Sequence, residues 1–267
     1  MQTIEMIDDG RIIPETADDL IALVHCFMDF GETLLLCGAE ISRVEDTIMR
    51  LGQAYGALRT NIFAISSNIT VTLQYPGNLE MTRTRRILTG CSTDFTKLEE
   101  LNELSRRCCR NPIPAAVLHR EVAKIREEKA PAAGFYAGSV LGAAAFALFF
   151  GGDLNDAAAT AVAGLLIAWM QRKLTSLFPN SMAFHLTASL VSGVLICLFG
   201  KAARFHVDMI TIGAIMLLIP GMAITNAVRD ILVGDTLAGV LRIIECLLIA
   251  GSLACGFMFA MVLTGGM

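Results

Sequence analysis

The sequence has few charged residues for its length and lacks the features of a soluble or nucleic-acid-binding protein. Only 17% of its 267 residues are charged and 54% are hydrophobic, a more apolar composition than soluble globular proteins usually have. The net charge is −4 and no broad basic surface is evident, which argues against nucleic-acid binding. The acidic N-terminus has no apolar stretch of the signal-peptide type, so we expect the first part of the chain to stay in the cytoplasm.

Motifs for metal binding and nucleophilic catalysis are also missing. The eight cysteines form no CxxC pair and no zinc-like spacing with histidine. There is no GxSxG, HExxH or Walker A motif. Ser66 or Ser67 could combine with His25 or His119 as nucleophile and base, but a polar strand connection and helix-surface histidines are the simpler interpretation. The sequence therefore predicts no catalytic residue, no metal and no cofactor.

The first 130 residues hold most of the charge and predict a small cytoplasmic α/β domain. Apolar residues at helical spacing predict a helix over 17–38, and Ser42 to Glu45 has the form of a capping box that starts a second helix. Residues 69–75 alternate between apolar and polar, which is typical of a strand. A turn at 76–78, further strands over 59–65 and 79–85, and helices over 93–107 and 114–129 complete this domain.

Residues 131–267 predict an α-helical membrane domain of about five spans. A span needs ~20 mostly apolar residues, and the candidates cover 131–150, 156–170, 181–199, 209–227 and 237–263. Lys and Arg over 120–129 precede the first span, which predicts a cytoplasmic N-terminus and a C-terminus outside. Gly134, Gly138 and Gly142 form overlapping GxxxG steps, which we expect to allow close helix packing.

The segment 219–245 carries polar and ionisable residues within this apolar region. Such residues at membrane depth are costly and often mark a transport path, and Pro220-Gly221 predicts a broken helix. Asn226, Arg229 and Asp230 share one helix face by spacing, and Arg242 and Glu245 do so on the next helix. Asp230 and Asp235 have an alternative place at the cytoplasmic interface. The predicted transport path comprises Pro220, Gly221, Asn226, Asp230, Arg242, Glu245, His185 and Asp153.

Two members of that path have simpler alternatives. Asp153 is expected to cap the second span rather than to face a substrate. His185 is either a proton relay or, more simply, hydrogen-bonded to a neighbouring helix.

Four segments together resemble the threonine/serine exporter (ThrE) family, in the form of its stand-alone N-terminal half. They read GETLLLCGAEISRVEDTIMRLGQAYG, ISSNITVTL, MTRTRRI and IPGMAITNAVRDILVGDTLAGVLRIIE. The resemblance covers residues 17 to 263. The positions that match the family's motifs in the cytoplasmic domain are Gly38, Ala39, Glu40, Arg43, Ser66, Ser67, Asn68 and Arg83. Those in the membrane half are Pro220, Gly221, Asn226, Asp230, Gly234, Gly239 and Arg242.

The resemblance implies one half of a secondary transporter that exports threonine or serine across the bacterial inner membrane. It also implies a partner, because the second block of helices found in fused members would come from a YjjB-like small membrane protein. The remaining expected partners are the lipid bilayer, a small polar metabolite and a further copy of the chain. The alternative substrate is a small dicarboxylate such as succinate. A membrane-anchored sensor or enzyme acting through the soluble domain is the alternative class.

Overall fold

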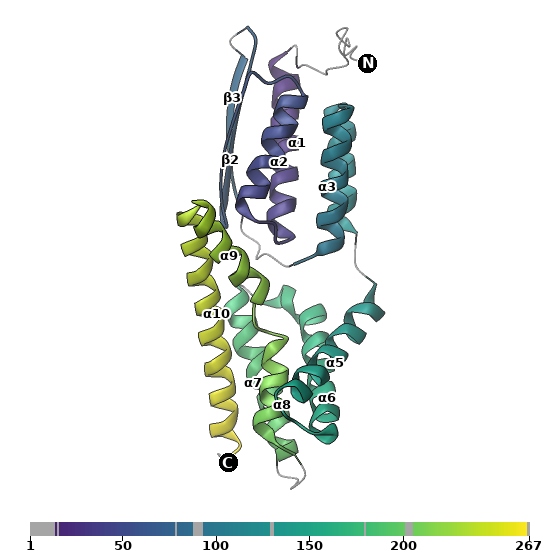
Figure 1. Cartoon of the computed structure of the whole chain (residues 1–267), viewed down its shortest axis with the longest axis vertical. Helices are drawn as coiled ribbons and strands as arrows, with labels where there is room; N and C mark the ends of the chain where they lie inside the picture. Colours follow the sequence, from purple (N-terminus) through teal and green to yellow (C-terminus); the bar gives the residue numbers. More distant parts are fainter. Residues whose placement is uncertain are drawn as a thin grey trace. The chain divides into compact units, whose positions relative to one another are not determined.

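The computed structural model describes residues 14, 16–77, 79–87, 93–128, 131–178, 180–200 and 205–265. Its contacts divide the chain into two compact units, whose elements are labelled in Figure 1. The sheet unit comprises Met1–Glu128 and Met222–Ile243. The helical unit comprises Lys129–Gly221 and Ile244–Met267. The segment 222–243, which hydropathy groups with the membrane spans, therefore makes its contacts with the sheet unit.

A three-stranded antiparallel sheet lies in the sheet unit. Its strands β1 (Arg59–Ile65), β2 (Asn68–Tyr75) and β3 (Leu79–Arg86) are paired in chain order, which confirms the three predicted strands. The alternating apolar residues of β2 are buried against helices, whereas the opposite face carries Thr–Thr hydrogen bonds between β2 and β3. A period-two pattern with one buried face fixes both the strand and its register.

Four helices of this unit come from the first half of the chain: α1 (Ala17–Leu36), α2 (Ile41–Ala54), α3 (Phe95–Arg110) and α4 (Ala115–Glu127). Helix α1 lies at the centre of the core, where Phe27, Phe30 and Leu34 are fully buried. The ring of Phe27 meets that of Tyr55 edge to face, with centroids 5.5 Å apart. In Figure 1, β2 and β3 lie along α1 and α2.

The capping box expected at Ser42 is wrong. Helix α2 begins at Ile41, and its N-cap is Glu40, two residues before Ser42, with no hydrogen bond from the Glu40 side chain to the helix. The Glu45 carboxylate instead accepts a hydrogen bond from the Ala64 N–H on β1, at 2.9 Å. Partial burial raises the pKa of Glu45 above its ordinary value. The local pattern failed because a tertiary partner competed successfully for the same carboxylate.

The helical unit contains α5 (Ala132–Phe149), α6 (Leu154–Leu174), α7 (Ser181–Gly200), α8 (Val207–Met216) and the C-terminal part of α10 (Thr236–Leu263). Among the described residues, α5, α7 and α10 are long and apolar enough to cross a membrane. A fourth span results if α8 and α9 (Gly221–Val233) are counted together, with a bend of 56° between them. Helix α6 does not meet the same criteria, and its place as a span stays a prediction.

Small residues bring the helices of this unit close together. A Cβ added at Gly134 or Gly138 would meet no atom of the described chain within 4 Å, whereas a Cβ at Gly142 would lie 3.7 Å from the Leu217 side chain, so the predicted GxxxG stripe packs at one of its three glycines. On α10, by contrast, a Cβ at Gly256 would overlap the Ser189 Oγ of α7. Glycine is required at this crossing because the two backbones approach so closely.

Candidate functional site

The turn between α1 and α2 presents backbone groups at the surface of the sheet unit. Helix α1 ends at Leu36, and Gly38 has a φ of +86°, a left-handed conformation that glycine adopts without steric cost. The N–H groups of Gly38 and Ala39 fold back onto the last carbonyls of α1, each at 3.0 Å. This C-cap leaves the Gly38 carbonyl and the Ile41 N–H available to another element.

Helix α9 occupies both of these backbone groups. The Asn226 Nδ2 donates to the Gly38 carbonyl at 3.0 Å, and the Asp230 Oδ1 accepts from the Ile41 N–H at 3.3 Å. A third contact joins the Arg229 Nη1 to the Glu40 Oε1 at 2.8 Å. Two sets of residues predicted separately, one in the soluble domain and one in the membrane path, therefore meet.

The expected shared face of Asn226, Arg229 and Asp230 is confirmed, because all three contact the α1–α2 turn. Asn226 and Asp230, one turn apart, are buried, whereas 64% of the Arg229 side chain is exposed. The Asp230 carboxylate supplies the cap that the Glu40 side chain does not give α2. The positive end of a helix dipole favours an anion at this position.

Asp230 also forms the buried ion pair of this site. Its Oδ2 lies 3.5 Å from the Arg242 Nη1, and the two side chains are 0% and 6% exposed. Within the described part of the chain, the Arg242 Nη2 has no hydrogen-bond partner. Arg242 therefore has an ion-pair partner on α9 that its spacing along α10 did not predict. The predicted pairing of Arg242 with Glu245 stays a prediction.

A cavity of about 300 Å³ lies beside these contacts. We call it the loop cavity. It is bounded by the α1–α2 turn, the first turn of α2, one face of α3 and the start of α9. Its lining combines both charge signs with amides and apolar groups: Gly38, Ala39, Glu40, Arg43, Phe95, Leu98, Glu99, Asn102, Arg106, Met222 and Asn226.

Sequence reasoning missed the α3 side of this cavity. Glu99, Asn102 and Arg106 follow one another at spacings of three and four residues, so they share a helix face. A polar face of this kind is usually solvated, and nothing in the sequence placed it opposite Arg43. The sequence shows that α3 has this polar face, but the position of the face beside Arg43 depends on the packing of α2 against α3.

The other predicted motif residues of the sheet unit do not line the loop cavity. Ser66 and Ser67 lie in the turn between β1 and β2, and Asn68 begins β2. Arg83 is exposed on β3. These positions agree with the polar strand connection expected for the serines.

A separate ion-pair network joins α1 to β3 and α4. Arg85 contacts the carboxylates of Asp29 and Glu32, the latter at 2.9 Å. The His119 Nδ1 lies 2.8 Å from the Asp29 Oδ2. His119 therefore faces a carboxylate, and these partially buried contacts hold the sheet to the helices.

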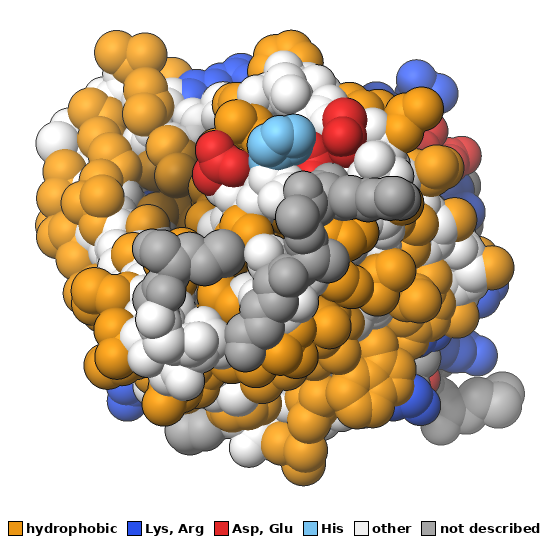
Figure 2. All heavy atoms as spheres, turned by 90° about the horizontal axis from the view of Figure 1, so that it is seen from below, with side chains coloured by type: hydrophobic (Ala, Val, Ile, Leu, Met, Phe, Trp, Pro, Cys, Tyr) orange, Lys and Arg blue, Asp and Glu red, His pale blue; other side chains and the backbone are white. Residues whose placement is uncertain are grey.

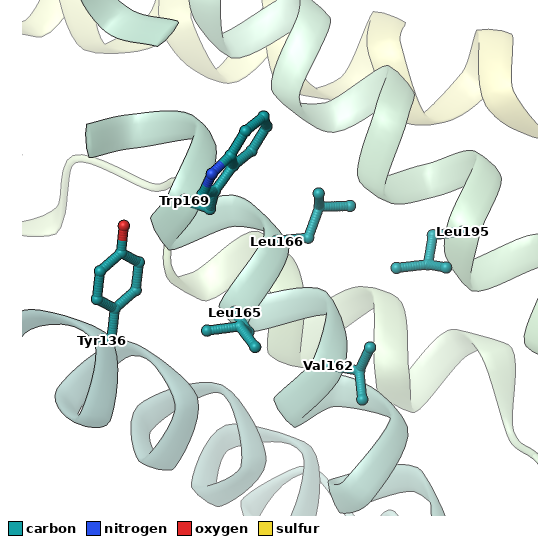
Figure 3. A pocket seen from close by; sticks show the side chains of 6 residues that line it. All are labelled: Tyr136, Val162, Leu165, Leu166, Trp169 and Leu195. Carbon is teal, nitrogen blue, oxygen red and sulfur yellow. The ribbon is translucent and has the colours of Figure 1, made fainter. Parts of the chain in front are cut away.

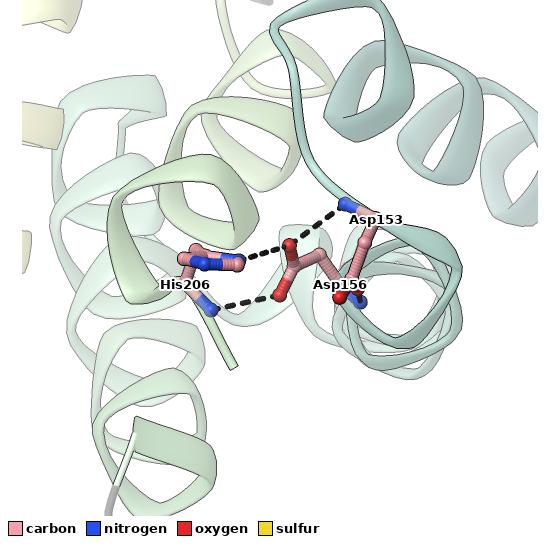
Figure 4. Close-up of side chains that lie close together, drawn as sticks. All are labelled: Asp153, Asp156 and His206. Atoms are coloured by element: carbon pink, nitrogen blue, oxygen red, sulfur yellow. Dashed lines mark hydrogen bonds and ion pairs between the residues drawn. The ribbon is translucent and has the colours of Figure 1, made fainter. Parts of the chain in front are cut away.

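In the helical unit, Asp153, Asp156 and His206 lie together (Figure 4). Figure 2 shows a histidine flanked by acidic side chains on a face that is otherwise mainly hydrophobic. The potential ligand atoms lie within 4.8 Å of one another, so they are close enough to hold a cation.

Hydrogen bonds account for this cluster. The Asp153 side chain caps α6, which confirms the expected cap. The Asp156 carboxylate accepts from the backbone N–H of Asp153 and from the backbone N–H of His206, at 2.9 and 2.8 Å, and contacts the His206 Nδ1 at 2.8 Å. The bond to Asp156 raises the pKa of the exposed His206. We therefore assign these residues to joining α6 and α8.

His185 does not reach a neighbouring helix through the contacts seen here. Its Nδ1 lies 2.6 Å from the Ser181 carbonyl and 3.1 Å from the Ser181 Oγ, one turn earlier on α7. The predicted interruption of the helix is present: α8 ends at Met216, and α9 begins at Gly221, directly after Pro220. The Gly221 N–H bonds to the Ile219 carbonyl at 2.9 Å.

A second cavity, in the helical unit, is apolar. It measures about 580 Å³ and is lined by Tyr136, Val162, Leu165, Leu166, Trp169 and Leu195 (Figure 3). These lining residues include no group that would bind a charged metabolite at neutral pH. In a membrane protein, acyl chains readily cover such a surface, so this cavity is a poor candidate for a polar substrate.

Comparison with known proteins agrees with the motifs. The family model described as "Putative threonine/serine exporter" (ThrE) matches residues 25–264. No curated protein and no solved structure matches the chain. The matched range includes the α1–α2 turn, the sheet, α9 and nearly all of α10, and on this basis the chain belongs to the threonine/serine exporter family.

Proposed function

We propose that this chain is the N-terminal half of a secondary transporter that exports threonine and serine across a bacterial inner membrane. The sheet unit would lie in the cytoplasm and the C-terminus outside. A YjjB-like membrane protein would supply the second half. Family membership supports the substrate class, and the basic residues of α4 just before α5 support the orientation.

One structural observation carries the proposal. Helix α9 follows the break at Pro220 and Gly221, and it is tied to the α1–α2 turn by Asn226, Asp230 and Arg229. A broken helix is a common way to build a substrate or ion site in transporters. Contacts between such a helix and a soluble domain give that domain a direct means to influence transport.

The test is export of labelled threonine from cells that lack other threonine exporters. We expect efflux when this chain and its YjjB-like partner are expressed together, and none with either protein alone. Efflux from liposomes that contain only this chain would overturn the half-transporter proposal. Efflux of succinate in place of threonine and serine would overturn the proposed substrate.

We also propose that the proton gradient drives export, with Glu245 on α10 as the group that carries the proton. Glu245→Gln should abolish export driven by an imposed proton gradient while leaving the partner complex intact. Ser252→Ala, also on α10, is the control, because the Ser252 Oγ bonds only to its own helix in the described structure. Unchanged proton-driven export in Glu245→Gln would remove this role.

A further inference from the structure

The loop cavity has a floor of buried groups and a charged rim. Ala39, Leu98 and Asn226 are buried, whereas Arg43, Glu99 and Arg106 are exposed. Its volume of about 300 Å³ is at the lower end of the range for small-molecule sites, roughly 300–1,000 Å³. The size therefore suits a small metabolite better than a nucleotide or a peptide.

The two arginines of the cavity have guanidinium groups available for an anion. Among the described residues, no carboxylate lies within ion-pair distance of Arg43 or Arg106, whereas the adjacent Arg107 pairs with Glu121 at 3.3 Å. Arginine binds carboxylates through two parallel N–H groups. Two such side chains from different helices, facing one cavity, can hold one carboxylate between them.

The cavity also carries negative charge and amides. Glu99 stands on the same face of α3 as Arg106, and Glu40 lies in the α1–α2 turn. A ligand with only negative charge would be repelled by these carboxylates. A ligand with both an ammonium and a carboxylate group matches both charge signs, and an amide such as Asn102 can bond to a hydroxyl.

We propose that the loop cavity binds a small zwitterionic α-amino acid with a short hydroxylated side chain. Arg43 and Arg106 hold its carboxylate, and Glu99 holds its ammonium group. The choice of a hydroxylated side chain rests on the proposed export function. Asn226 lines the cavity and also donates to the Gly38 carbonyl, so the bound amino acid touches the residue that ties α9 to the turn.

Binding is tested with the purified full-length chain in detergent, by titration calorimetry with L-threonine, L-serine and succinate. We expect both amino acids to bind and succinate to bind more weakly. Arg43→Gln and Arg106→Gln should each weaken threonine binding by about tenfold or more, since each removes a charge-assisted hydrogen bond. Arg110→Gln is the matched control: it removes an exposed arginine one turn further along α3, outside the cavity.

Melting temperatures of all variants establish that they are folded, which the exposure of these side chains leads us to expect. Wild-type affinity in Arg43→Gln and Arg106→Gln, or tighter binding of succinate, would overturn the inference. If the purified chain binds neither amino acid while cells with the YjjB-like partner export threonine, the inference fails and the export function stands. Threonine binding without export would leave the cavity assignment standing and remove the export function.

Discussion

Replacing Asp230 with asparagine should destabilise the sheet unit strongly, although the two side chains have nearly the same shape. The amide oxygen of the introduced asparagine can still accept the Ile41 N–H, so the cap on α2 is retained. The negative charge that faces Arg242 is lost. The substitution thus isolates the ion pair from the hydrogen bond.

The expected cost follows from the geometry of the pair. At the observed separation of 3.5 Å, two unit charges attract by about 5 kcal/mol in an effective dielectric of roughly 20. Removing one partner of a buried pair typically costs about 3–5 kcal/mol, because the other charge stays buried without compensation. At about 2–4 °C per kcal/mol, Asp230→Asn should melt at least ~6 °C below wild type.

The assay is thermal unfolding of the purified chain in detergent, followed by far-UV circular dichroism. Tryptophan fluorescence is unsuitable, because the single tryptophan, Trp169, lies in the helical unit. Arg229→Gln is the matched control one residue away. Its ion pair with Glu40 is largely exposed on the arginine side, so its loss should cost about 0–1 kcal/mol.

A double-mutant cycle with Arg242→Met separates the pair from general damage to α9 and α10. If Asp230 and Arg242 form a buried pair, the double variant should be more stable than the sum of the single losses predicts. Strict additivity would refute the reasoning. So would a melting temperature of Asp230→Asn equal to that of Arg229→Gln.

Three further predictions concern a histidine, a carboxylate and a glycine. The pKa of His206 is raised in the folded protein, so its protonated form stabilises the fold fully below about pH 6.5. This stabilisation is lost as pH rises through the pKa of His206 in the folded state. In His206→Gln, the melting temperature should therefore change less with pH across that range. The pKa of Glu45 is raised in the folded protein, so ionisation of Glu45 lowers stability as pH rises. Glu45→Gln can still accept a hydrogen bond from the Ala64 N–H, and it should melt above wild type at neutral pH. At about pH 4, near the ordinary pKa of a glutamate, the two proteins should melt at the same temperature. Gly256→Ala should lower the melting temperature, at a cost of about 1–3 kcal/mol through overpacking. Gly251→Ala on the same helix has nothing within 4 Å of the added Cβ, and it should keep or raise the melting temperature because alanine favours a helix over glycine.

Elements with a regular pattern and one buried face were predictable from the sequence. The alternation over 69–75 corresponds to β2, and the strands on either side of it pair with it in antiparallel order. The apolar runs that became α5, α7 and α10 were equally clear. In each case the periodicity or length reports burial directly, so no distant contact was needed to interpret it.

Side-chain partners were not predictable in the same way. Asp230 bonds to a backbone group 189 residues away, and spacing along α9 contains no information about that group. A local rule also failed where a distant partner competed, because Glu45 bonds to β1 in place of its own helix. Spacing along α10 likewise did not predict the contact of Arg242 with Asp230 on α9. Short-range spacing shows which groups can meet, and packing decides which of them do.

Helix α9 gives the charged segment a different physical explanation from the one its hydropathy suggests. An ionised side chain facing lipid is expensive, but Asn226 and Asp230 face the α1–α2 turn, where both are buried and hydrogen-bonded. Hydrogen bonds to protein groups therefore offset the free energy of burying these two side chains, and no water-filled path is needed to explain their presence. These two residues are better candidates for coupling the α1–α2 turn to the broken helix than for lining a pore. The residues that bond α9 to the turn follow Pro220 and Gly221 within ten residues, so these contacts lie close to the 56° bend between α8 and α9.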